Sequence, residues 1–364
     1  MTNSRVKSPL FSLTHRTRAK YITRWMLYMK LNAMDRVRDP IEKSADDSID
    51  LYDVTSWEVR TRTDWIASVL WRGLSAVARL TVVLVAFSLL LGVGGLAVLT
   101  DPATGLLTLF SALPAIGLTA YVYFSDVTSS EPLSLLTITF LLGVLTANFA
   151  AVLNTLFRPL FRVLGFVGLI LFFFMVVAPI EESVKLLAVR LYAYTNDQFN
   201  SVLDGAVYGA MAGLGFAVIE NALYIARQLP SGGADLGLGL IGVGGGITAV
   251  RALAGPGHVI YSAIAGYYLG LAKFNPGSRG PIVIKGLLLA AVIHATYNST
   301  VGFGSALIES VTGLGGLFPS LIYIVIYDSI FGLYLFQKIR RYSVRYQQTQ
   351  TIPTSPESPQ REQN

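Results

Sequence analysis

The chain has 364 residues, of which 53% are hydrophobic and 14% are charged, and its mean hydropathy is +0.55. A soluble domain of this length is much less apolar, so the composition excludes a soluble fold and indicates a polytopic membrane protein. The net charge is +6, and the basic residues gather at both ends of the apolar region, which the positive-inside rule explains better than a nucleic-acid partner does. No Cys is present, so disulfides and thiolate metal sites are excluded, and a metal ligand would have to be His, Asp or Glu.

Residues 1–72 are interpreted as a cytoplasmic tail. They lack a short apolar segment followed by a cleavage site, so they do not read as a removable signal. Basic residues alternate with Tyr21, Trp25 and Met29, and two interpretations stay open: a helix lying in the plane of an anionic membrane surface, or a solvated tail. Residues 39–64 turn acidic and are interpreted as a soluble linker.

Residues 73–340 contain the apolar windows, and a spanning helix needs about 20 mostly apolar residues. Eight windows meet this length: residues 74–99, 105–124, 133–156, 160 to beyond 180, 202–226, 247–274, 282–303 and 317–336. The Gly-rich stretch "GLGLIGVGGGI" could be a ninth span, a loop or a re-entrant segment. Basic segments at both ends favour two cytoplasmic termini and therefore an even number of spans. We predict an all-α bundle of about eight transmembrane helices, followed by a disordered cytoplasmic tail at residues 341–364.

Several ionisable residues fall inside these apolar windows, where even the lowest insertion scales assign roughly 2.5 to 3.5 kcal/mol to a charge at a helix centre. Such residues are a functional hypothesis by default. They are Glu181, Glu182, Lys185, Asp204, Glu220, Arg251, His258, His294 and Asp328.

Two of the polar clusters carry carboxylates. In "APIEESVKLL", Lys185 follows the pair Glu181 and Glu182 by one helical turn and can form an ion pair with either. In "GFAVIEN", Phe216 and Glu220 lie one turn apart on the same helix face.

Two further clusters carry histidine. His258 follows Pro256 in "RALAGPGHVIYS", and in "HATYN" the side chains of His294 and Asn298 can address one point. Two imidazoles and several carboxylates would suit zinc or another divalent ion, and a carboxylate that does not bind the metal could act as general base on a bound water.

Each cluster also has a structural explanation. The "EESVK" segment by itself is more often an ion pair in a helix, a single buried His is more often hydrogen-bonded than a ligand, and "HATYN" could hold two helices together. Asp204 is expected to cap a helix, and Asp328 to pack against a polar partner. None of these explanations accounts for four helices that each carry a polar cluster.

The depth of the clusters gives a further expectation. On straight helices, Glu182 and His294 lie about 14 to 18 Å from the cytoplasmic ends, whereas Glu220 lies closer to the outer face. A kink at Pro179 or a tilted helix would bring the four clusters to one level, in the middle to outer half of the bilayer.

The motifs "EESVK", "GFAVIEN", "RALAGPGHVIYS" and "HATYN" together resemble those of the PrsW family of prokaryotic intramembrane proteases, which is related to the CAAX prenyl endopeptidases and bacteriocin-processing proteins. The resemblance covers residues 161–303. It implies hydrolysis of a peptide bond in or beside a membrane segment of a membrane-anchored protein, in the plasma membrane of a prokaryote. A metal-bound and a metal-free activation of water both stay open.

The resemblance implies these roles for the residues. Glu181 or Glu182 would be the general base, and Lys185 would orient or neutralise the pair. Zinc or a water molecule would be held by Glu220, His258 and His294, while Asn298 would support the tetrahedral intermediate. The alternative is a proton- or cation-coupled transporter that uses the same residues as a relay.

Overall fold

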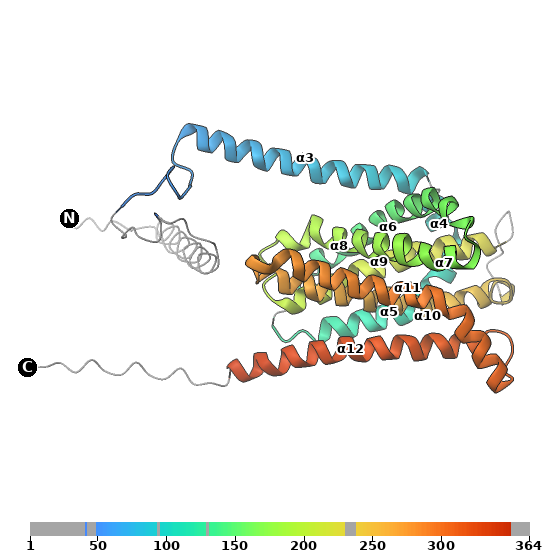
Figure 1. The fold of residues 1–364 in the computed structure, drawn as a ribbon. Helices are drawn as coiled ribbons and strands as arrows, with labels where there is room; N and C mark the ends of the chain where they lie inside the picture. The colour runs from blue at the N-terminus through green and yellow to red at the C-terminus, as the bar shows by residue number, and fades with distance from the viewer. Residues whose placement is uncertain (1–40, 42–48, 93–94, 129–130, 230–237, 351–364) are drawn as a thin grey trace, which may run out of the picture. The chain divides into compact units, whose positions relative to one another are not determined.

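The computed structural model describes residue 41 and residues 49–92, 95–128, 131–229 and 238–350 (Figure 1). In these ranges the regular elements are helices and there is no strand, apart from one isolated bridge between Tyr52 and Ser56. The all-α prediction is therefore confirmed. The tail segments 1–40 and 351–364, on which the in-plane helix and most of the disordered tail were predicted, lie outside the described residues.

The helices follow the predicted windows closely. Their bounds are α3 Arg62–Gly92, α4 Gly95–Thr100, α5 Pro102–Phe124, α6 Leu133–Arg162, α7 Gly165–Phe172, α8 Ala178–Leu191, α9 Val202–Gln228, α10 Leu238–Lys273, α11 Arg279–Thr312 and α12 Phe318–Gln350 (Figure 1). Among the described residues, seven helices are long and apolar enough to cross a membrane, with α7 and α8 forming one continuous span. α10 is an eighth long helix that is not among these seven, and it carries Arg251, Pro256 and His258 within a few turns.

Several boundaries differ from the sequence prediction. α3 begins at Arg62, inside the tail predicted for residues 1–72, and α11 continues to Thr312, beyond the window predicted to end at residue 303. The third window does not end at residue 156, because α6 continues to Arg162 and the turn comes at Gly165, whose φ of 55° suits glycine. From Leu238 onward the Gly-rich stretch is the start of α10, so it is neither a separate span nor a loop there. α12 continues to Gln350, so the tail boundary predicted at residue 341 falls inside this helix.

The chain divides into two compact units, formed by residues 1–72 with 275–278 and by residues 73–274 with 279–364. In the first unit, Asp64 organises the beginning of α3: its Oδ2 accepts the backbone N–H groups of Arg60 and Thr61 and the hydroxyl of Tyr52. All the clusters predicted for the functional site lie in the second unit.

The second unit is built around α9, the most buried of the seven spans, which packs against α10, α6 and α5. Glycines permit this close packing. A Cβ on Gly209 of α9 would lie 2.3 Å from the carbonyl oxygen of Ser262 in α10, and one on Gly215 would lie 2.1 Å from that of Phe140 in α6. Small residues let helix backbones approach in this way. The approach brings the polar residues of α9 and α10 within reach of each other.

A π-helical turn at Phe173–Val177 interrupts the span formed by α7 and α8. It lies directly before Pro179, the position where a kink was predicted; proline lacks the N–H that an α-helical turn would use. Wider turns of this kind occur frequently at functional sites. Here the turn ends where α8 begins, immediately before Glu181 and Glu182.

Candidate active site

A cavity of about 930 Å³ opens between the helices of the second unit. It is lined by polar residues of five helices, together with apolar side chains: Asn148 and Asn154 of α6, Glu181 of α8, Glu220 of α9, Arg251 and His258 of α10, and His294 and Asn298 of α11. The predicted clusters therefore face one shared space, and they do not point to different faces of the bundle.

The two adjacent glutamates of α8 have different surroundings. Glu181 lines the cavity, and its Oε1 accepts a hydrogen bond from Asn154 Nδ2 at 3.1 Å. Its Oε2 is buried and has no hydrogen-bond partner among the described residues. Glu182 is fully buried, and its Oε1 contacts both Lys185 Nζ at 2.7 Å and His294 Nδ1 at 2.8 Å. Glu182 Oε2 likewise has no partner among the described residues, but Glu182 does not line the cavity, so Glu181 is the glutamate whose free oxygen faces the cavity.

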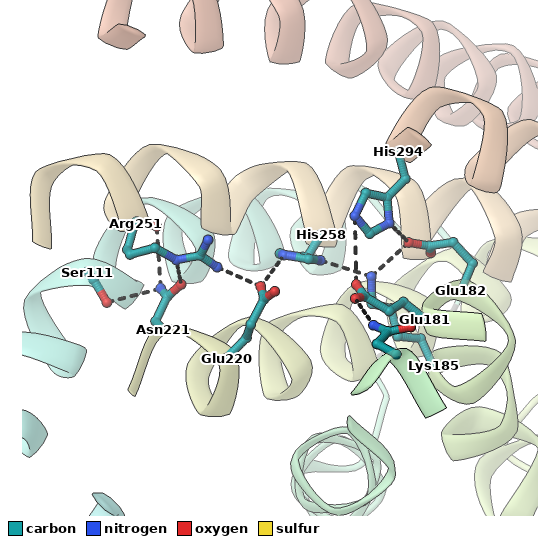
Figure 2. A network of polar contacts seen from close by, with 10 residues as sticks. Ser111, Glu181, Glu182, Lys185, Glu220, Asn221, Arg251, His258 and His294 are labelled. Atoms are coloured by element: carbon teal, nitrogen blue, oxygen red, sulfur yellow. Dashed lines mark hydrogen bonds and ion pairs between the residues drawn. The ribbon is translucent and has the colours of Figure 1, made fainter. Parts of the chain in front are cut away.

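His294 is oriented by Glu182 (Figure 2). The carboxylate of Glu182 can only accept a hydrogen bond, so Nδ1 of His294 carries the proton and is the donor. In the neutral ring Nε2 then keeps a free lone pair. Nε2 lies 3.7 Å from Glu181 Oε2. The ring of Tyr261 stacks on His294 at 5.3 Å between centroids, which fixes the imidazole plane. The unprotonated nitrogen of His294 therefore faces the free oxygen of Glu181.

His258 lies between two charged residues (Figure 2). Its Nε2 is 2.7 Å from Glu220 Oε2, and its Nδ1 is 2.9 Å from Lys185 Nζ. With Nε2–H donating to Glu220, Nδ1 is left as the acceptor for Lys185. Phe216, the aromatic residue of the "GFAVIEN" motif, packs on His258 at 5.2 Å and lies under the Lys185 ammonium at 4.3 Å.

A second chain of polar contacts begins at Glu220 (Figure 2). Arg251 Nη2 donates to Glu220 Oε2 at 2.6 Å, and Arg251 Nε donates to Asn221 Oδ1 at 2.7 Å. Asn221 Nδ2 in turn donates to Ser111 Oγ of α5 at 3.0 Å. The close packing of α9 on α10 places Glu220 beside His258.

Three potential ligand atoms converge at the centre of the site. They come from Glu181, His258 and His294, all buried, and lie within 4.8 Å of one another. The metal set expected from the resemblance contained Glu220 in place of Glu181. In the structure Glu220 contacts His258 Nε2, the ring nitrogen that does not contact Lys185, and so Glu220 holds this ring in place. Asn298 lines the cavity one turn after His294.

Several residues of this network were missed or left without a role. Arg251 was expected only as an ionisable residue inside an apolar window, and no role was predicted for Asn221. Asn154 and Ser111 carry no signal in the sequence, because isolated polar residues in apolar helices are common and their partners are far away in the chain.

The two structural explanations given for isolated acids can also be compared with the structure. Asp204 forms a capping box with Ser201 at the start of α9, so its prediction as a cap is confirmed. Asp328 of α12 lies beside Gly257 of α10: a Cβ on this glycine would come within 3.3 Å of Asp328 Oδ1 and 2.9 Å of Tyr261 Oη.

Known proteins match the part of the chain that contains this site. The family model described as "PrsW family intramembrane metalloprotease" matches residues 131–330. A protein named "Protease PrsW" from Geobacillus kaustophilus is 32% identical over 191 residues, which are 51% of this chain and 75% of the relative. Proteins of the same name from Halalkalibacterium halodurans and Bacillus subtilis are 30% and 31% identical, over 51% of this chain and 79% and 78% of their own lengths. No solved structure matches the chain.

Proposed function

Because the chain belongs to the PrsW family of intramembrane metalloproteases and is a peptidase of the membrane, we propose that its water-activating centre consists of Glu181, His258 and His294. Its substrate would be a membrane-anchored protein, cleaved in or next to a membrane segment. The observation that carries the proposal is the convergence of these three side chains on one cavity.

The donor set fits a divalent metal such as zinc. Two imidazole nitrogens and one carboxylate oxygen are ligands that zinc prefers, and Glu181 Oε2 is a buried oxygen without a partner among the described residues. Each histidine also has a carboxylate on its other nitrogen, Glu182 for His294 and Glu220 for His258, an arrangement common around metal-ligating histidines. To offer its Nδ1, His258 would have to release Lys185, which would keep its contact with Glu182.

A divalent ion held by these residues would lower the pKa of a bound water and polarise the scissile carbonyl. The same oxygen does not hold the ion and take the proton: Glu181 Oε2 would be a ligand where the ion is bound, and in a metal-free site it would take a proton from the attacking water, whose oxygen forms a bond to the carbonyl carbon. The C–N bond then breaks, and the proton passes to the leaving amine. Asn298 would donate a hydrogen bond to the oxyanion of the tetrahedral intermediate.

The remaining polar residues would position these groups. Glu182 holds the ring of His294, and Lys185 compensates the charge of Glu182 in a fully buried place. Arg251 holds Glu220, which holds His258. A coupled transporter could use similar residues, but membership in a peptidase family favours proteolysis.

The proposal keeps the predicted topology, with both termini in the cytoplasm, and the order of a tail (residues 1–72) before a protease domain (residues 73–340). The two boundaries of that domain fall inside α3, which begins at Arg62, and α12, which ends at Gln350. The helices of this integral membrane protein agree with a domain embedded in the bilayer.

The deciding experiment uses a membrane-anchored reporter that is reconstituted with the purified chain in liposomes. We expect the wild type to release the soluble part of the reporter, and the Glu181→Gln and His294→Ala variants to release none above background. Exposed Glu309 on α11 provides the matched control Glu309→Gln, which should cleave like the wild type. Equal cleavage by all four proteins would disprove the assignment of the centre.

A further inference from the structure

A second group of acidic side chains lies at the other end of α9. Asp126 and Glu131 come from the connection between α5 and α6, and Asp204 comes from the first turn of α9. One carboxylate oxygen of each residue lies within 4.8 Å of the others. Asp204 precedes Glu220 by 16 residues of helix, or about 24 Å, so this cluster is distinct from the candidate active site.

Two carboxylate oxygens of this cluster accept no hydrogen bond from the described residues. Asp204 Oδ2 accepts the backbone N–H groups of Asn200 and Ser201, and its Oδ1 accepts the hydroxyl of Ser201. Asp126 Oδ1 accepts both the N–H and the hydroxyl of Thr128. Glu131 Oε2 accepts the hydroxyl of Tyr208. Asp126 Oδ2 and Glu131 Oε1 are buried and have no donor among the described residues.

The burial of Glu131 is the independent observation that points to a ligand. Its side chain is only 3% exposed although it belongs to a connection between helices, where a carboxylate could reach water by turning outward. A buried carboxylate oxygen without a donor is costly unless a cation or a proton compensates it. The position of Glu131 therefore indicates that a cation or a proton occupies the cluster.

The described basic residues nearby do not supply that charge directly. Lys273 Nζ donates to the backbone carbonyl oxygens of Tyr194 at 2.9 Å and Phe199 at 2.7 Å, and the same ammonium lies over the rings of these two residues. It acts on the acids only through space. The other titratable groups that act on the cluster are Tyr208 of α9 and Tyr342 of α12.

We propose that Asp126, Glu131 and Asp204 form a binding site for a hard divalent cation, Ca²⁺ or Mg²⁺, that ties the α5–α6 connection to the start of α9. The donors are all oxygens, which these ions prefer, and the cluster contains neither the nitrogen nor the sulfur ligands that would favour zinc. The site is structural and separate from the proteolytic centre.

The cation competes with protons. Burial, with the nearby charges of Asp204 and Asp126, raises the pKa of Glu131 to about 8, although the Tyr208 hydroxyl opposes this shift. Burial likewise raises the pKa of Asp126 to about 6. A cation that binds there would displace such protons, so acid should weaken its binding.

The test measures cation binding to the purified full-length chain in detergent. Tb³⁺ is the probe, because the ring of Tyr208, whose hydroxyl contacts Glu131, can sensitise the luminescence of a Tb³⁺ ion bound there. Ca²⁺ and Mg²⁺ are then titrated as competitors. We expect a saturable signal from the wild type and at least about tenfold weaker binding by Glu131→Gln and Asp126→Asn, because carboxylate charge sets such affinities. The Glu309→Gln control should bind like the wild type.

Two further measurements keep the proposal open to disproof. The Glu181→Gln variant should keep the full Tb³⁺ and Ca²⁺ response; loss of the response there would assign the ion to the proteolytic centre and overturn the proposal. At pH 7.5, addition of Ca²⁺ or Mg²⁺ to the wild type should release protons, and addition to Glu131→Gln should release fewer. A wild type that binds neither ion saturably would show that the cluster holds only protons, which also overturns the proposal.

Discussion

Glu182 Oε1 lies 2.8 Å from His294 Nδ1, although these residues are 112 positions apart in the chain. This contact separates the roles of two adjacent glutamates. The second oxygen of each glutamate has no hydrogen-bond partner among the described residues, but Glu182 contacts the histidine and Lys185 and does not line the cavity, whereas Glu181 lines the cavity and offers its oxygen there.

We therefore expect unequal effects from the two conservative substitutions. Glu181→Gln should lower kcat/KM by about 10² to 10⁴, the range of a lost general base. Glu182→Gln should lower it by about 10 to 100, the usual effect of removing a residue that orients a metal ligand. Cleavage of the reporter in liposomes measures both, and a larger loss for Glu182→Gln would reverse the assignment.

Lys185 should matter for stability as well as activity. Lys185→Met leaves the fully buried Glu182 without its cation, and breaking a buried pair in this way costs about 3 to 5 kcal/mol. Thermal unfolding in detergent should show a clear decrease in Tm. The double variant Glu182→Gln with Lys185→Met removes both charges and should be less destabilised than the sum of the single variants; strict additivity would contradict a direct ion pair.

Removal of metal separates the two ways of activating water. If the histidines and Glu181 hold zinc, the chelator 1,10-phenanthroline should abolish cleavage and added Zn²⁺ should restore it. Elemental analysis should find the metal in the wild type and less of it in His258→Ala. Full activity in metal-free protein would favour the metal-free mechanism, with Lys185 remaining on His258.

The contact between α9 and α10 should be sensitive to added volume. A Cβ on Gly209 would lie 2.3 Å from the Ser262 carbonyl oxygen, so Gly209→Ala must push the helices apart. We expect a destabilisation of about 1 to 3 kcal/mol and weaker cleavage, because Glu220 and His258 also move apart. Gly117→Ala on α5 is the matched control, since its Cβ would meet no atom within 4 Å. Equal Tm values for the two variants would argue against this packing.

The acidic cluster makes stability depend on pH. The pKa of Glu131 is raised to about 8 in the folded chain, while an unfolded Glu titrates near 4.3. Between these values the folded state binds more protons than the unfolded state, so the free energy of unfolding decreases as pH rises from about 5 to 8. In EDTA, Tm should fall over this range in the wild type and fall less in Glu131→Gln. Parallel curves would show that Glu131 does not titrate in this window.

Much of the fold could be read from composition, because long apolar windows without charges have few alternatives to membrane helices. Boundaries were less accurate. The turn after α6 came later than expected, at Gly165, and the Gly-rich stretch from Leu238 joined α10, because helix ends depend on neighbouring segments as well as on local composition.

The sequence by itself determined the class of the protein and the residues of its candidate site. Glu181, Glu182, Lys185, Glu220, His258 and His294 could be selected because ionisable groups in apolar helices are costly and need a reason. Their assignment to roles depended on the tertiary structure. Distances between helices that are far apart in the chain decide three points: which glutamate offers its oxygen to the cavity, why Glu220 supports His258, and how Asn154 reaches Glu181. Those distances follow from the glycine contacts that let α9 approach its neighbours, and such contacts leave no periodic signal along the sequence.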